Sequence, residues 1–333
     1  MLSGEGHDVV VVDAGPIGAT IAAKFPPSTR FFTAPERLML RGWPVPSVTQ
    51  EKTTGEEYLA YLRMFVAGSG LRVHTFTRVI GIAGSRGDFR VQTITPDGQI
   101  ATISCDVLVL ATGGTDGPRR LGVPGEDLAC VHTDLGDPHR FFGRTVLVVG
   151  GRNSAAESAL RLYRVGARVH LAHREPELHP RVKHWIRPEV QSLLVEGQIV
   201  GHLPRRLVRI DPGRVTLAAP ASADAAATGG PIETTETLDV DDVLLQIGYT
   251  QDGAVFALAG IATSGDAGAP VLDGATMESD VPGVYVVGTA TAGTQDRFDV
   301  FIENSHQHAD RVAAALAGRP APTPVAPRPL PES

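Results

Sequence analysis

The sequence predicts an α/β protein in which parallel strands alternate with helices. The run Val146–Gly150 is a continuous apolar strand that leads into Gly151 and then into small residues that can open a helix. A second strand–turn–helix pattern, His7–Ala23, carries Gly15 and Gly18. Continuous apolar runs of this kind are typical of strands buried on both faces. Together these features indicate two Rossmann-like, three-layer nucleotide-binding domains.

Composition limits the classes of function. The chain has 333 residues, which is enough for two medium domains with separate cores. A formal net charge of −7 gives no basic footprint for nucleic acid. No apolar run is long enough to cross a bilayer, and Met1–Asp8 is too polar for a signal peptide. We therefore expect a cytoplasmic protein without nucleic-acid or membrane partners.

The sequence contains two cysteines, Cys105 and Cys130, which lie far apart and form no C-x-x-C motif. A dithiol centre of the thioredoxin kind is therefore not expected. Cys105 lies in a strand-like run and is expected to be a small buried hydrophobe, while nothing beside Cys130 lowers its pKa. The sequence has no G-x-S-x-G elbow and no metal-ligand spacing, and it identifies no catalytic residue.

The first glycine turn is incomplete. Gly15 and Gly18 keep two of its glycines, but the first position is Asp13, whose carboxylate would repel a pyrophosphate. Pro26–Pro27 then break the helix, and no apolar second strand with a terminal acid follows. Glu36 has the spacing of a ribose-binding acid but lies in a loop-to-helix passage. Half of a dinucleotide pocket is thus missing from this unit.

The remaining elements follow from apolar spacing. An amphipathic helix is expected over 55–65, and alternating runs predict an antiparallel meander with strands at 71–76, 79–83, 89–95 and 99–104. The strand Asp106–Leu110 ends in Ala111–Thr112–Gly113, whose small residues let a flat ligand lie against the backbone. Later patterns predict strands within 200–217, 237–246 and 284–288, a flexible hairpin loop at 218–231, a helix over 301–317 and a Pro/Ala-rich disordered tail at 319–333.

The central turn is the better nucleotide site. Gly150 and Gly151 allow a sharp turn and close approach to a pyrophosphate, although Arg152 replaces the usual second glycine. The N–H groups of a helix that starts at Ser154 point at the anion, and Ala155 keeps the helix close to the strand. The helix 154–165 and a second strand, 168–172, complete a βαβ start.

The end of this second strand indicates which dinucleotide binds. Four basic residues follow it: His173, Arg174, Arg181 and Lys183. A site for NAD would place an acid here on the ribose hydroxyl, whereas cations suit the 2′-phosphate of NADPH. Arg174 offers a planar fork of donors, and Lys183 or Arg181 would close the other side. Glu175 is the one opposing acid, so solvated surface charges remain the alternative.

The order of these segments resembles a known family. The segments GPIGA, ATGG, GVPGEDL, VVGGRNSAAESALRLYRVGARVHLAHR, VKHWIRPE, IGYT and VFIEN follow one another as in the thioredoxin-reductase-like flavoproteins, and most closely the bacillithiol disulfide reductase family. The likeness extends to about Ala317. It implies an FAD-type domain (1–117 and 248–318) interrupted by an NADPH-binding domain (118–247). It also implies a homodimer that passes a hydride from NADPH through FAD to a small disulfide.

The resemblance and the glycine turns together give the candidate site residues. For FAD these are Gly15, Pro16, Gly18, Thr112, Gly113, Gly288, Ile302 and Glu303. For NADPH they are Gly150, Gly151, Arg152, Asn153, Ser154, Ala155, His173, Arg174, Lys183 and Gly248. A helix that starts near Ile302 would stabilise negative charge on the reduced flavin ring.

The sequence departs from the family at three points. Asp13 replaces a glycine, Ile17 replaces the cysteine of the family's first turn, and the segment carrying the second strand is missing after Ala23. One reading is an NADPH-dependent oxidoreductase with weakly bound or altered FAD. The rival is a flavin-free NADPH-binding protein with a sensing, scaffolding or partner-subunit role. A third reading is that the missing segment is an error of the sequence.

Overall fold

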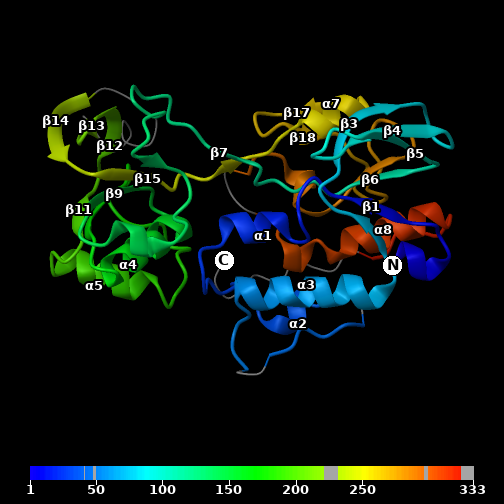
Figure 1. The fold of residues 1–333 in the computed structure, drawn as a ribbon, viewed down its shortest axis with the longest axis horizontal. Helices are drawn as coiled ribbons and strands as arrows, with labels where there is room; N and C mark the ends of the chain where they lie inside the picture. The colour runs from blue at the N-terminus through cyan, green and yellow to red at the C-terminus, as the bar shows by residue number, and fades with distance from the viewer. Residues whose placement is uncertain (41, 48–49, 221–231, 296–298, 324–333) are drawn as a thin grey trace. The chain divides into compact units, whose positions relative to one another are not determined.

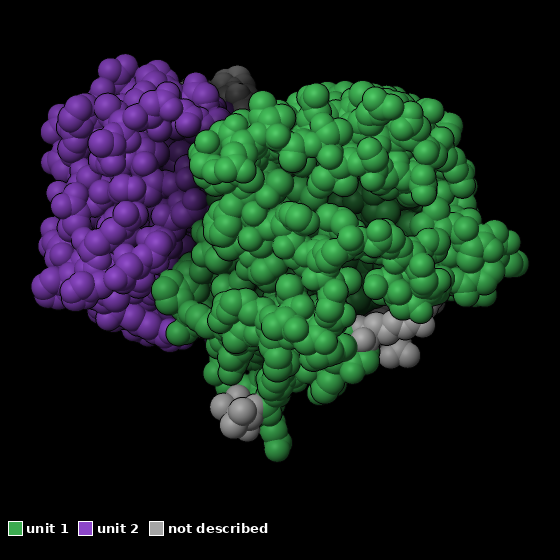
Figure 2. All heavy atoms as spheres, turned by 45° about the vertical axis from the view of Figure 1, so that its right-hand side comes forward, with its two compact units in different colours: residues 1–117, 249–328 green, residues 118–248, 329–333 purple. Residues whose placement is uncertain are grey.

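The computed structural model describes residues 1–40, 42–47, 50–220, 232–295 and 299–323. These residues form two compact units, which Figures 1 and 2 show. Unit 1 holds Met1–Gly117 and the described residues from Tyr249 onward, and unit 2 holds Pro118–Gly248. Both are α/β structures with parallel strands, as the sequence predicts. Within the described residues, no helix is long and apolar enough to cross a membrane.

Unit 2 is a three-layer structure built on a parallel sheet. Its strand order is β11-β10-β9-β15-β8. The strands are β8 (Val131–His132), β9 (Thr145–Val149), β10 (Arg168–Ala172), β11 (Val200–His202) and β15 (Asp242–Leu245). Helices α4 (Asn153–Arg164) and α5 (Arg187–Val195) belong to one layer. The other layer is the antiparallel sheet β12 (Arg206–Asp211), β13 (Arg214–Pro220) and β14 (Ile232–Asp239).

The central strand β9 explains why its sequence is continuously apolar. Val146 and Val148 pack into the core beneath α4 and α5, while Leu147 and Val149 pack into the core shared with β12 and β13. All four side chains are buried. A strand with a core on each face needs apolar residues at every position.

Unit 1 contains two short parallel pairs and a meander. Strand β1 (Val10–Val12) pairs with β2 (Arg72–His74), and β6 (Leu108–Leu110) pairs with β19 (Val284–Val286). The meander is β3 (Arg78–Ala83), β4 (Phe89–Ile94) and β5 (Ile100–Cys105). The prediction that the run 71–76 belongs to the meander is wrong, because β2 pairs in parallel with β1. Alternation of apolar residues indicates a strand but does not choose its partner.

The helices of unit 1 have clear sequence signals at their ends. Helix α3 (Gly55–Ser69) starts at a capping box of Thr54 and Glu57 and stops at Gly70, which adopts a left-handed conformation (φ 67°). It is therefore longer than the predicted 55–65. Other short elements are η1 (Leu2–Glu5), α1 (Ala19–Lys24), α2 (Pro35–Leu38), α7 (Ala254–Ala259), β17 (Thr263–Ser264) and β18 (Ala269–Pro270).

The last helix begins later than the sequence predicts. Helix α8 spans His306–Leu316, and Ile302–Asn304 forms a separate 3₁₀ turn, η4. The predicted helix start at Phe301 is therefore wrong. The Phe301 N–H donates to the Asn304 side-chain oxygen, and this local bond closes the short turn ahead of the helix. The remaining short elements are η2 (Pro138–Phe141) and η3 (Gly288–Ala292).

Strand β1 differs sharply from its counterpart β9. Val11 is 39% exposed, whereas the matching residues of β9 are buried. Within the described residues, no strand falls between Asp13 and Gly70, and only isolated bridges occur there. The chain there instead forms a cluster of buried residues against α3, namely Phe31, Leu38, Val45, Tyr58 and Tyr61. The Tyr61 hydroxyl fastens this segment, since it accepts from Leu40 N and donates to Trp43 O.

Two connections join the units, and they lie side by side as β7 (Gly117–Pro118) and β16 (Tyr249–Thr250). Gly248 directly precedes β16 and has a φ of 101°. Its carbonyl accepts a hydrogen bond from Arg119 N, just after β7, at 3.0 Å.

The predicted hairpin loop and the predicted C-terminal tail each lie partly outside the described residues. The predicted hairpin loop 218–231 overlaps β13 at Ala218 and Ala219, and residues 221–231 lie outside the described residues. The predicted disordered tail begins too early, because Arg319 donates to the Glu5 carboxylate at 2.7 Å. The rest of that prediction, from 324 onward, again lies outside the described residues.

Candidate functional site

The turn after β9 requires both of its glycines. Gly150 has a φ of 141°, and a Cβ there would collide with the Gln246 carbonyl at the end of β15. A Cβ on Gly151 would collide with the imidazole ring of His173. The Ala155 methyl is completely buried beside this turn. The sheet and the neighbouring ring thus leave room for backbone only, as a phosphate-binding turn needs.

Helix α4 begins directly after this turn. Arg152 is its N-cap residue and makes no side-chain capping hydrogen bond, Asn153 is its first residue, and Ser154 is exposed. The backbone N–H groups of a helix N-terminus attract anions, because the helix dipole adds to their donors. Turn and helix therefore form one potential phosphate site.

Basic groups surround this turn. Burial, with the positive charges of Arg174, His179 and Arg152, lowers the pKa of His173 to about 4. Burial also lowers the pKa of His179, and the nearby guanidinium groups of Arg152, Arg181 and Arg187 lower it further. Repulsion of this kind shows that the groups are close enough to sense one another. An anion at the turn would relieve it.

The candidate Arg174 lies exposed at the end of β10. Its partner in the structure is Glu175, at 3.6 Å between Arg174 Nε and Glu175 Oε1. Both side chains are largely exposed, so this ion pair contributes little and is easily exchanged for a stronger one.

Lys183 is buried and paired with an acidic side chain. Its side chain is 8% exposed, and Lys183 Nζ lies 3.1 Å from Glu157 Oε2 on α4. Its backbone N–H donates to Asn153 Oδ1 at 2.8 Å. The amine is thus paired with a buried carboxylate in the structure, and its role at a cofactor phosphate stays a prediction. The sequence shows that Lys183 follows the strand β10, but it does not show that its amine pairs with Glu157.

The first turn, after β1, uses its glycines differently. A Cβ on Gly15 would lie 2.7 Å from the Ala19 Cβ, and one on Gly18 would lie 2.5 Å from Leu59 Cδ2. Pro16 contributes its carbonyl to Ala19 N at 3.0 Å. Meanwhile the Asp13 carboxylate accepts from Gly15 N at 2.8 Å. The glycines thus serve helix packing, and one N–H that would face a pyrophosphate already has an acceptor.

The ends of β6 and β19 form a second region of small residues. Gly113 has a φ of 85°, and a Cβ on Gly114 would lie 3.2 Å from the Thr289 carbonyl oxygen. Thr112 is exposed beside them. Gly288 N donates to His308 Nδ1 at 3.1 Å, so this histidine carries its proton on Nε2. His308 is buried and supports the end of β19 through this bond.

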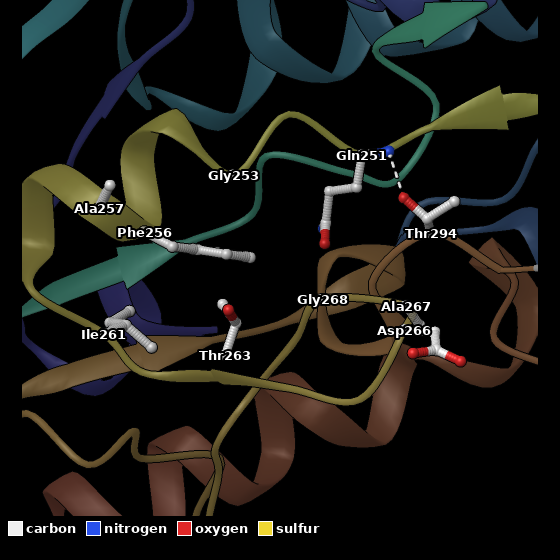
Figure 3. Close-up of a pocket in the computed structure, with 10 residues that line it drawn as sticks. All are labelled: Gln251, Gly253, Phe256, Ala257, Ile261, Thr263, Asp266, Ala267, Gly268 and Thr294. Carbon is white, nitrogen blue, oxygen red and sulfur yellow. Dashed lines mark hydrogen bonds between the residues drawn. The ribbon is translucent and has the colours of Figure 1, made fainter. Parts of the chain in front are cut away.

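Gln251 braces the same strand ends and was missed by the sequence. Its Nε2 donates to Gly113 O at 2.7 Å and to Ala290 O at 2.9 Å. The Thr294 hydroxyl accepts from Gln251 N at 2.9 Å, the bond drawn in Figure 3. Figure 3 shows Gln251 among the residues that line a pocket of about 360 Å³, together with Phe256 and Thr263. The only available signal was a polar residue just after the IGYT segment.

Ile302 and Glu303 belong to another part of unit 1. Ile302 packs against the cluster of Phe31, Tyr58 and their neighbours. Burial, Tyr61 and Glu303 together raise the pKa of Tyr58 to about 12. Ile302 and Glu303 lie in the 3₁₀ turn η4. They are therefore not at an α-helix N-terminus that could stabilise a reduced flavin ring.

Comparison with known proteins identifies the family. A family model described as pyridine nucleotide-disulphide oxidoreductase matches residues 2–288. The chain belongs to this family. Bacilliredoxin reductase Bdr of Bacillus subtilis (strain 168) is 30% identical over 316 residues, which cover 94% of this chain and 91% of the relative. The chain is thus an oxidoreductase of the flavin disulfide-reductase type, and the predicted resemblance is confirmed.

Solved structures support the same assignment. Bacillithiol Disulfide Reductase Bdr (YpdA) from Bacillus cereus matches with a TM-score of 0.86 at 29% identity, covering 95% of this chain and 93% of that one. The protein of the same name from Staphylococcus aureus gives 0.84 at 26%, with 95% and 92% covered. The T. acidophilum thioredoxin reductase gives 0.62 at 19%, covering 93% and 96%, which supports the fold alone. The predicted fold of two Rossmann-like domains is confirmed.

The family implies a flavin and a nicotinamide cofactor, and the two units suit them unequally. In unit 2, the glycine turn, the start of α4 and the basic side chains near His173 and His179 fit a dinucleotide. In unit 1, the strand ends carry the glycines Gly113 and Gly288, so a flat ring there would meet backbone without side chains. The turn at Gly15, however, carries a carboxylate, and no described residue between Asp13 and Gly70 forms the strand that would carry a ribose-binding acid. In unit 1 the Asp13 carboxylate therefore lies at the turn that a flavin pyrophosphate would approach.

Both cysteines are free thiols. Burial and the nearby Asp106 carboxylate raise the pKa of Cys105, which disfavours the reactive thiolate. Ile17 occupies the first turn with an aliphatic side chain. Among the described residues, no group of three or more His, Cys, Asp and Glu side chains is arranged to hold a metal ion.

Proposed function

We propose that this protein is an NADPH-dependent oxidoreductase that delivers reducing equivalents, through a weakly bound FAD, to a small disulfide or another small acceptor. The observation that carries the proposal is a group of arginines, Arg152, Arg174, Arg181 and Arg187, close to the two histidines that lie against Gly151. The names of the relatives, bacilliredoxin reductase and bacillithiol disulfide reductase, support a disulfide as the acceptor.

The roles in unit 2 follow from charge and geometry. Gly150, Gly151 and the α4 N-terminus bind the pyrophosphate through backbone N–H groups. Arg174 binds the 2′-phosphate through its planar fork, with His173 and Arg181 nearby. Ala155 keeps α4 close to the sheet, and Gly248 belongs to the connection that leaves the unit. When bound, NADPH supplies a hydride, and the chain's residues hold and orient it.

The flavin is proposed to bind weakly because unit 1 holds only part of it. Thr112, Gly113 and Gly288 line the strand ends that would accept the ring. The region that would bind the adenosine half of FAD lacks a second strand and carries the Asp13 carboxylate. Each lost charge-assisted hydrogen bond costs roughly 1–3 kcal/mol of binding free energy. Two or three such losses together raise the dissociation constant by several powers of ten.

The Asp13–Gly15 bond also favours a second candidate function. If the first turn accepts no cofactor phosphate, the chain is a flavin-free NADPH-binding protein with a sensing, scaffolding or partner-subunit role. The two candidates differ in one measurable property. The first needs bound flavin to oxidise NADPH, and the second does not oxidise it at all.

The test is purification without added flavin, followed by a visible spectrum and titration with FAD, FMN, NADPH and NADH. We expect a protein that is pale or colourless, binds NADPH more tightly than NADH, and oxidises NADPH only when FAD is added. A yellow protein with one tightly held FAD per chain overturns the weak flavin site. No NADPH oxidation at saturating FAD favours the second candidate. A homodimer and a cytoplasmic location complete the proposal, and light scattering and cell fractionation measure them.

A further inference from the structure

A buried ion pair lies next to the proposed cofactor turn and has no direct part in it. Lys183 Nζ lies 3.1 Å from Glu157 Oε2, and their side chains are 8% and 13% exposed. Glu157 also binds Arg161 Nη2 at 2.8 Å, one turn further along α4. Removing such charges from water costs free energy that a pair of apolar side chains would not cost. Stability alone therefore does not account for a charged pair at this place.

The backbone around the pair ties one loop to the cofactor turn. Lys183 N donates to Asn153 Oδ1 at 2.8 Å, and Asn153 Nδ2 donates to Arg181 O at 3.3 Å. His179 N donates to Gly151 O at 2.9 Å. The loop His179–Lys183 is thus fastened to the turn at one end and to the first residues of α4 at the other. This fastened loop carries the basic side chains of His179 and Arg181.

We propose that Asn153, Glu157 and Lys183 are positioning residues that hold the His179–Lys183 loop against the glycine turn and thereby set the preference for NADPH over NADH. This inference rests on the proposed function. Glu157 holds the Lys183 amine, Asn153 holds the loop backbone, and the loop presents the Arg181 guanidinium to the ribose phosphate. Lys183 acts through the loop and does not touch the phosphate.

For a substitution at Glu157, this proposal and a purely electrostatic account predict opposite changes in NADPH affinity. Glu157 is an acid close to an anion site, so removal of its charge alone would strengthen binding of a phosphorylated cofactor. If Glu157 holds the loop, Glu157→Gln releases Lys183 and weakens NADPH binding instead. NADH lacks the 2′-phosphate and uses the same turn, so its affinity stays unchanged. The ratio of the two affinities therefore separates positioning from general damage to the fold.

The experiment measures dissociation constants of NADPH and NADH for the full chain by fluorescence titration, together with the melting temperature. We expect Glu157→Gln and Lys183→Met each to lower the NADPH preference about tenfold, the size of one charge-assisted contact. We expect Lys183→Arg, which keeps the ion pair, to retain most of the preference. Arg161 remains a partner for Glu157 in Lys183→Met, so that variant retains a paired carboxylate. Glu189→Gln, which breaks an exposed ion pair between Arg164 and Glu189, is the matched control.

The outcomes distinguish the two proposals. A parent protein that binds NADH as tightly as NADPH overturns the cofactor assignment and this inference with it. A parent that prefers NADPH, with Glu157→Gln equal to or better than the parent, overturns only the positioning role. Equal weakening of both cofactors in Glu157→Gln and Lys183→Met also overturns it, since a purely structural pair would act in that way.

Discussion

The Asp13 carboxylate accepts a hydrogen bond from the Gly15 backbone N–H at 2.8 Å, across the turn that follows β1. A side-chain oxygen therefore occupies a donor that a phosphate oxygen would use in a complete dinucleotide turn. The corresponding turn of unit 2 has no carboxylate, and cations surround it instead. The two turns thus have similar glycine patterns and opposite electrostatics.

Asp13→Gly should strengthen FAD binding. The change frees the Gly15 N–H and removes a negative charge near the pyrophosphate, so we expect a gain of about tenfold or more in affinity. Quenching of flavin fluorescence on titration measures it. Asp13→Asn is the control, because it removes the charge and keeps an acceptor for Gly15 N. If neither variant binds FAD more tightly than the parent, the carboxylate is not what weakens the site.

Arg174→Ala should reduce the preference for NADPH over NADH. The guanidinium is the one candidate that lies exposed at the end of β10, where a 2′-phosphate would reach it. Loss of a charge-assisted contact predicts a change of about ten- to a hundredfold in the NADPH dissociation constant and none for NADH. Titration of both cofactors checks this, with Arg164→Ala as the matched surface control. An unchanged ratio would show that the 2′-phosphate binds elsewhere.

Binding of NADP⁺ should take up protons. In the free protein the pKa of His173 is lowered to about 4, so its imidazole is neutral near pH 7. A bound phosphate stabilises the imidazolium and raises this pKa, and affinity then increases as the pH falls through the raised pKa. Calorimetry in buffers of different ionisation enthalpy measures the uptake directly.

The controls for proton uptake are His173→Gln and the cofactor NAD⁺. The variant should bind with less proton uptake than the parent, because the titrating ring is gone. NAD⁺ has no 2′-phosphate and separates the effect of the pyrophosphate from that of the ribose phosphate. Equal proton uptake by parent and variant would remove His173 from the explanation.

The sequence predicted those elements whose residue pattern is compatible with only one kind of secondary structure and burial. Val146–Val149 is apolar at every position because cores lie on both of its faces, so the strand could be read directly. The run at β2 was recognised as a strand but given the wrong partner. Its short alternation is equally compatible with the meander and with β1, and only the tertiary fold chooses between them.

The sequence could not predict how charges and turns are shared between distant elements. Lys183 lies near the cofactor turn in sequence order, but its amine is taken up by Glu157 on another element. Ile302 was read as the start of a helix, yet it packs on the cluster around Tyr58, and a local bond from Phe301 N closes a separate turn. The Lys183–Glu157 pair and the packing of Ile302 are contacts between distant residues, which a local pattern does not reveal.

The cysteines should not be needed for NADPH oxidation. Cys105 is a free thiol whose pKa is raised by burial and by Asp106, and Cys130 is also free. Ile17 occupies the turn where the family's cysteine is expected, so no thiol is available there. A Cys105→Ser, Cys130→Ser double variant should therefore retain the parent's rate of NADPH oxidation with added FAD, measured by absorbance of the nicotinamide. Melting curves and NADPH affinity serve as controls for folding. Loss of the rate in a folded variant that still binds NADPH would mean that one of these thiols takes part in turnover.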